Sequence, residues 1–143
     1  MDLRSSVEIS ASGLRAQSLR MRVIAENLAN AQSVATTPDG EPYRRRVVTF
    51  EPVLDAPRET ARGETPAVQG VKVRGITTDN SAFQRVYQPG HPAADEQGYV
   101  RMPNVSSLIE SADMKAAQRS YEANINAIEA ARSMTMRTID LLK

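Results

Sequence analysis

The apolar residues near the C-terminus recur with the spacing of a helix, and no Gly or Pro interrupts residues 104–143. Their spacing of three and four residues predicts one long helix with a buried stripe. Good N-caps are available at Asn104 and, with a capping box to Glu110, at Ser107. The stripe comprises Met114, Ala117, Tyr121, Ile125, Ile128, Ala131, Thr135, Ile139 and Leu142. A neighbouring face of small side chains comprises Ala112, Ala116, Ala123, Ala127, Ala130 and Met134.

The predicted helix is too long for a compact domain of this chain. Forty residues of helix span roughly 60 Å, whereas a compact globule of this chain length is about 37 Å across. We therefore expect the helix to pair with another long helix of the chain, to be buried by other subunits, or both.

A second helix is predicted from Leu3 to about Ala31, with Gly13 inside it. Its large apolar side chains recur every seven residues, as in a coiled-coil seam. That column is Val7, Leu14, Met21 and Leu28, and the softer companion column is Ser10, Gln17, Ile24 and Ala31. The alternative is an amphipathic helix packed on a globular core.

The middle of the chain reads as short strands. Alternating β-formers at residues 46–53 and 71–74 predict two strands, and residues 83–87 and 99–102 are further candidates. Residues 56–70 are rich in Pro, Thr, Gly and charge, which is typical of a mobile loop.

These elements predict an α+β fold, in which long N- and C-terminal helices form an antiparallel coiled-coil-like pair around an inserted small antiparallel β domain. The expected division is a helix over residues 1–32, a β-rich domain over 33–103, and a helix over 104–143. Both chain ends would then lie at the far tip of the helix pair.

Composition excludes several classes of function. The 18 Lys and Arg residues nearly balance the 17 Asp and Glu residues, so bulk charge attracts neither nucleic acid nor an acidic membrane. The chain has no cysteine for disulfides or thiol chemistry. No apolar run is long enough for a transmembrane helix, and the first ten residues lack the apolar core of a cleavable signal peptide.

Candidate chemistry is sparse. The single histidine, His91, has Asp95 and Glu96 nearby, but no second histidine completes a metal site. The basic run at residues 44–46 fits a solvated strand entry or a subunit contact better than a nucleic-acid patch. We expect no catalytic, metal-binding or cofactor-binding residue, no cofactor, no nucleic acid partner and no small-molecule substrate. The sequence predicts an interaction protein.

Specific motifs sharpen this expectation. They are residues 9–17 (ISASGLRAQ), 27–31 (NLANA), 42–45 (PYRR), 86–92 (VYQPGHP), 98–105 (GYVRMPNV) and 119–124 (RSYEAN). Together they span nearly the whole chain. In these runs the sequence resembles the bacterial flagellar rod and hook family of axial proteins, and within it the proximal rod proteins.

The resemblance implies a structural subunit of the proximal rod of the flagellar basal body, which transmits torque and forms part of a hollow export tube. Its implied partners are other rod proteins, the protein joining the rod to the membrane ring, copies of itself in a helical assembly, and the flagellar export apparatus. The chain would reach the periplasm-spanning rod without signal cleavage. The alternative is a coiled-coil adaptor or accessory protein of a type III export system. Residues expected at subunit or helix-packing contacts are Val7, Leu14, Met21, Asn27, Leu28, Asn30, Met114, Tyr121, Ile125, Ile128, Ile139 and Leu142.

Overall fold

The computed structural model describes residues 3–54 and 68–141. Its elements are, in chain order, α1 (Leu3–Ala29), β1 (Arg46–Leu54), β2 (Val68–Thr78), β3 (Gln84–Tyr87), β4 (Tyr99–Met102) and α2 (Ser107–Asp140). The predicted α+β class is confirmed, with one long helix on each side of a β-rich middle.

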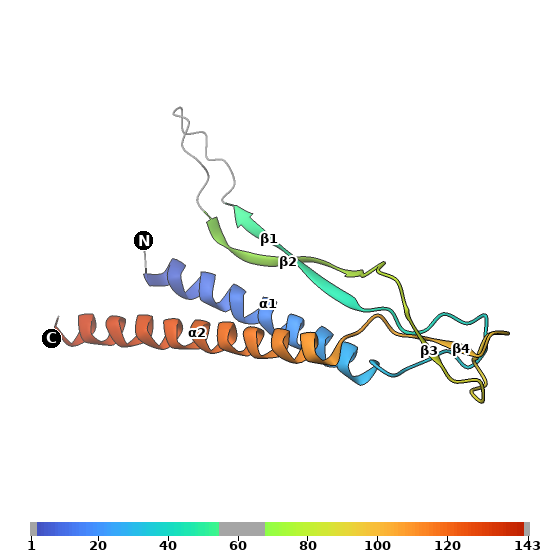
Figure 1. Ribbon diagram of the computed structural model, residues 1–143. Coiled ribbons are helices and arrows are strands. Elements are labelled where there is room, and N and C mark those ends of the chain that lie inside the picture. Colours follow the sequence, from blue (N-terminus) through green and yellow to red (C-terminus); the bar gives the residue numbers. More distant parts are fainter. Residues whose placement is uncertain (1–2, 55–67, 142–143) are drawn as a thin grey trace, which may run out of the picture.

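The two helices pack against each other and run antiparallel (Figure 1). The first turn of α1 and the last turn of α2 lie at the same end of the molecule (Figure 1). The 34 residues of α2 exceed the 27 of α1, so α2 extends beyond its partner. Every residue from 132 to 141 is exposed.

The strands pair as two separate two-stranded antiparallel sheets, whereas the sequence predicted one small β domain. In the first sheet β1 pairs with β2, and Phe50 lies opposite Val73. In the second sheet β3 pairs with β4, and Val86 lies opposite Val100. Figure 1 shows the second sheet beyond the ends of the helices.

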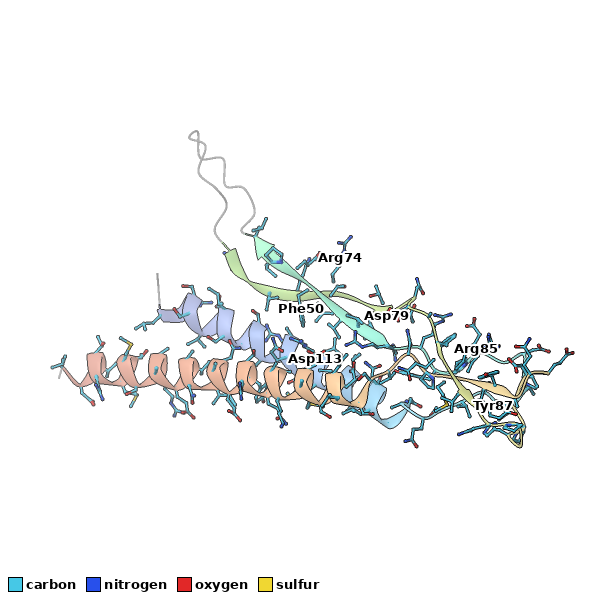
Figure 2. The ribbon with its side chains drawn as sticks, viewed as in Figure 1. Phe50, Arg74, Asp79, Arg85, Tyr87 and Asp113 are labelled. Atoms are coloured by element: carbon cyan, nitrogen blue, oxygen red, sulfur yellow. The ribbon has the colours of Figure 1, made fainter. Side chains whose placement is uncertain are left out.

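The β1–β2 hairpin runs back along α1 (Figure 1). Alternation along β2 gives it an apolar face, with Val71 and Val73 lining a groove beside Ala16 and Leu19 of α1. Arg74, the next residue, points away from the helices (Figure 2). A two-stranded hairpin is marginally stable alone, so its contact with α1 provides the apolar cover that it needs.

The expected starts of the C-terminal helix were both wrong. The N-cap is Ser106, which makes no side-chain capping hydrogen bond. Asn104 cannot cap the helix because its side chain is bonded to Arg45, Asp79 and Ser81. Glu110 turns inward to Arg45 and Asn27 instead of completing a capping box with Ser107.

The core is narrow. Its buried apolar residues on the helices are Ala16, Val23, Ile24, Ala117 and Ala131, most of them small. Polar side chains share this core, and both Asn27 and Glu110 are almost fully buried. Specific polar contacts must therefore contribute to the arrangement of the elements.

The sequence also predicted a mobile loop at residues 56–70 and no transmembrane helix. Of the loop expected at 56–70, residues 56–67 lie outside the described residues, and 68–70 begin β2. Within the described part of the chain, neither helix combines the length and apolarity of a membrane span.

Candidate functional site: the helix seam and its polar junction

The α1 residues at the centre of its contact with α2 are small or polar. Gly13, Arg20 and Asn27 are seven residues apart along α1 and face α2 in turn. A Cβ atom built on Gly13 would lie 2.7 Å from Oδ1 of Asn124, so the Asn124 amide packs in the space that the missing side chain leaves. The Arg20 guanidinium is 3.5 Å from Oδ1 of Asp113. This column is one position away from the predicted apolar column.

Glu110 is the centre of the polar junction, which comprises Asn27, Tyr43, Arg45, Asn104 and Glu110. Its carboxylate is fully buried, yet both oxygens are bonded. Oε1 accepts a 2.6 Å hydrogen bond from Nε of Arg45, and Oε2 accepts one of 2.9 Å from Nδ2 of Asn27. A buried charge is strongly destabilising when unpaired, so Glu110 constrains the positions of both partners.

Asn27 ties the end of α1 to the start of β1. Its Oδ1 accepts hydrogen bonds of 2.9 Å from the hydroxyl of Tyr43 and from the backbone N–H of Arg46. Its Nδ2 also donates to the carbonyl oxygen of Arg46. Burial raises the pKa of the Tyr43 phenol above its ordinary value of 10.0.

Arg45 and Asn104 connect the junction to the remaining strands. The Arg45 backbone N–H donates to Oδ1 of Asn104 at 2.7 Å, and its guanidinium lies 3.3 Å from Asp113 and 3.8 Å from Asp79. Nδ2 of Asn104 donates to the carbonyl oxygen of Asp79 and to the Ser81 hydroxyl. The Ser81 backbone N–H lowers the pKa of Asp79 below its ordinary value. The junction thus joins both helices, β1 and the end of β2.

A second set of contacts, separate from the junction, joins the β1–β2 hairpin to α1. The Ser12 hydroxyl donates to the Ile9 carbonyl at 2.6 Å and accepts the backbone N–H of Val71 at 3.0 Å. Gly70 has φ +149°, and a Cβ atom there would lie 2.5 Å from the Ser12 hydroxyl. Only glycine adopts this backbone and leaves room for the contact.

The predicted column of large apolar residues lies beside the seam, whereas members of the softer column are buried in it. Ile24 of the softer column is 5% exposed, and Ser10 is also buried. Asn27 is buried at the junction, and Nδ2 of Asn30 donates to the Glu26 carbonyl near the end of α1. Half-buried members of the expected contact set are Val7, Leu14, Met21, Leu28, Met114, Tyr121, Ile125 and Ile128. Their role between subunits stays a prediction.

Among residues 3–54 and 68–141, none covers the distal part of α2. Ile139 is 47% exposed, and Leu142 lies outside the described residues. Met134, Met136 and Leu141 are also exposed. The alanine face is exposed along its length, at Ala112, Ala116, Ala123, Ala127 and Ala130.

The turn with His91 is held by local bonds. Nδ1 of His91 accepts the backbone N–H of Ala93 at 3.0 Å. Asp95 accepts hydrogen bonds from the backbone N–H groups of Gln97 and Tyr99 and pairs with Arg85 (Figure 2 labels Arg85). In the two described stretches, no three His, Cys, Asp or Glu side chains are placed to hold a metal ion.

The basic run enters the structure as a set of internal contacts. Arg45 and Arg46 pair with Glu110 and Glu26, and the Arg44 guanidinium lies 4.2 Å from the centre of the Phe83 ring. The run leads into β1 as predicted, but the Arg45 side chain is 23% exposed and paired with the buried Glu110, so it is not the solvated entry that the sequence predicted.

Sequence reasoning missed the junction. Tyr43, Arg45, Asn104 and Glu110 were seen as motif or capping residues, because their partners lie up to 83 positions away. The sequence signal that could have indicated the junction was the presence of polar residues in three separate motifs, at residues 27–31, 42–45 and 98–105.

The family profile and the similar proteins found by sequence comparison all belong to flagellar basal-body rod proteins. The profile of the flagellar basal body rod FlgEFG protein C-terminal family matches residues 96–141. The flagellar basal-body rod protein FlgC of Agrobacterium fabrum is 46% identical over 99% of this chain and 96% of its own length. The FlgC proteins of Salmonella typhimurium and Borreliella burgdorferi are 43% and 38% identical, over 99% and 100% of this chain and 98% and 99% of their own lengths.

Proposed function

The chain belongs to the FlgC family of flagellar basal-body rod proteins, and from this premise we infer how its helix pair serves the rod. It is a structural subunit of the bacterial flagellar basal-body rod, and its relatives are structural proteins. Assembly with other rod components follows from that identity.

The exposed C-terminal end of α2 supports a role of this helix in assembly. Residues 132–141 are exposed and include Met134, Met136, Ile139 and Leu141. A marginal helix gains its stability mainly from tertiary packing, and here the packing must come from other subunits. The terminal helices are therefore the assembly elements.

We further propose where the subunit lies in the rod and that it transmits torque. The subunit lies in the proximal rod, crosses the periplasm as part of a hollow tube, and transmits torque from the membrane ring toward the hook. The polar junction supports this role, because bonds among α1, α2, β1 and β2 resist rotation of the helix pair against the strands. Buried polar networks of this kind favour one arrangement over its alternatives.

The proposed partners are copies of the chain, other rod proteins, the protein that joins the rod to the membrane ring, and the flagellar export apparatus. Export occurs without removal of a signal peptide. Contacts between subunits are heterologous, since such contacts generate helical order. The adaptor alternative is disfavoured by the family relationship, and it predicts a soluble protein outside the rod.

Isolation of basal bodies tests the proposal. A strain whose own copy of the chain is deleted should be non-motile and form no complete rod, and the returned chain should restore both. Antibody labelling of purified basal bodies should place the chain near the membrane ring. Restored motility with the chain absent from those particles would instead indicate the adaptor.

A further inference from the structure

Two exposed pairs of opposite charge lie on the two helices with equal spacing. Arg15 and Arg22 are seven residues apart on α1, and Glu122 and Glu129 are seven apart on α2. Seven residues are nearly two helical turns, so each pair shares one helix face. All four side chains are exposed, and none makes an ion pair or hydrogen bond within the described ranges 3–54 and 68–141.

The pairs cannot meet within one molecule. Gly13 and Asn27 define the side of α1 that faces α2, and at 100° per residue Arg15 and Arg22 point well away from that side. Likewise Ala117 and Ala131 are buried on the inner side of α2, whereas Glu122 and Glu129 are on an outer side. The matched charges can therefore be satisfied together only between molecules.

We propose that α1 of one copy packs antiparallel against α2 of a second copy, with Arg15 opposite Glu129 and Arg22 opposite Glu122. This contact rests on the proposed function as a rod subunit and specifies one of its interfaces. The occupant is a second copy because one chain carries both complementary faces with the same spacing.

The charges on either side of the pairs select the register. Glu8 precedes Arg15 by seven residues, and Lys115 precedes Glu122 by seven. In the proposed register neither faces a like charge. A shift of one heptad to the register found within the molecule would place Arg22 against Lys115 and Glu8 against Glu129. Like charges in direct opposition are destabilising and exclude wrong pairings.

The register implies a stagger between copies. Within one molecule Gly13 is level with Asn124 and Asn27 with Glu110, whereas the proposed contact is displaced by seven residues. Seven residues of helix rise about 10 Å. A contact that joins two different faces with such an axial step propagates as a helix and does not close as a flat ring.

Charge reversal tests the contact in a strain lacking its own copy of the chain. The variants R15E/R22E and E122R/E129R should each lower the amount of chain in purified basal bodies by about tenfold or more. The quadruple variant, with all four charges reversed, should recover most of the loss because the pairs match again. Normal incorporation of either double variant, or a quadruple variant no better than both doubles, would overturn the contact.

Cysteine pairs give an independent reading, since the chain has no cysteine of its own. In assembled rods R22C/E122C should form a ladder of disulfide-linked multimers, and R22C/K115C should not. A ladder from the second pair alone, or from neither pair in motile cells, would overturn the register. Absence of the unmodified chain from basal bodies would overturn the proposed function, whereas its presence with failed rescue overturns this contact alone.

Discussion

Nδ2 of Asn27, at the end of α1, donates a 2.9 Å hydrogen bond to Oε2 of Glu110 in the first turns of α2. The two residues are 83 positions apart and both are buried. Because the same asparagine also binds the backbone of Arg46, this bond fixes two helices and a strand at one point. The direction of the helix pair relative to the hairpin is set there.

Replacing Glu110 should destabilise the subunit more than any exposed change on α2. Glu110→Ala removes the acceptor of the Arg45 Nε–H and one of the two acceptors of Asn27 Nδ2, and breaking this buried ion pair should cost about 3 to 5 kcal/mol in the free energy of unfolding. Glu110→Gln keeps the shape and should cost about 1 to 3 kcal/mol. Urea unfolding measures both, with the exposed Gln118→Ala as the control. Equal effects of Glu110→Ala and the control would contradict the role of the junction.

The close approach at Gly13 predicts a coupled pair. Gly13→Val should cost about 1 to 3 kcal/mol through overpacking against Asn124. In an Asn124→Ala background the same change should cost much less, because the obstructing amide is gone. A double-mutant cycle by urea unfolding measures the coupling. Gly75→Ala is the control, since a Cβ atom there would meet nothing within 4 Å. Additive effects would show that the helices are not in contact at this point.

The sequence predicted the helices well because their periodic patterns are local. It also located the strands, but it did not show that the hairpin covers α1, since alternation at Val71 and Val73 indicates an apolar face without identifying its partner. The helix seam was displaced by one position for a related reason. Leu14 and Met21 have the stronger apolar signal, whereas Gly13, which has no side chain, leaves room for the Asn124 amide on the side that faces α2.

The half-buried apolar columns predict a loss of assembly on charge insertion. Leu14→Asp and Ile128→Asp each place a carboxylate where a neighbouring helix would have to desolvate it. Both variants should reduce motility and incorporation into the rod, whereas Ser18→Asp, at an exposed site of α1, should have a smaller effect. Motility in soft agar and the chain content of basal bodies are the measurements. Normal assembly of both apolar-site variants would show that these columns are not contacts between subunits.

Acid should weaken the β3–β4 sheet through Asp95. The backbone N–H of Tyr99, together with Arg85 and the N–H of Gln97, lowers the pKa of this carboxyl below its ordinary value of 3.8. A lowered folded-state pKa stabilises the fold above that ordinary value, and the stabilisation is lost as pH falls through the folded-state pKa. Unfolding followed by the fluorescence of Tyr87 and Tyr99 should therefore depend on pH below about 4. The dependence should be shallower in Asp95→Asn. An unchanged slope in that variant would exclude Asp95 as a source.

Hydrogen exchange on the free and assembled subunit tests the central claim most directly. In a dilute monomer, backbone amides of residues 132–140 should exchange fast, as should those of the first turns of α1, because ordering costs about 1 to 2 kcal/mol per residue without packing to offset it. Amides near Asn27 and in the paired segments around Phe50 and Val73 should be protected. In the assembled rod the amides of residues 132–140 should become protected as well. Uniform protection of α2 to its last turn in a monodisperse monomer would contradict the account, since the helix pair would then need no neighbouring subunit.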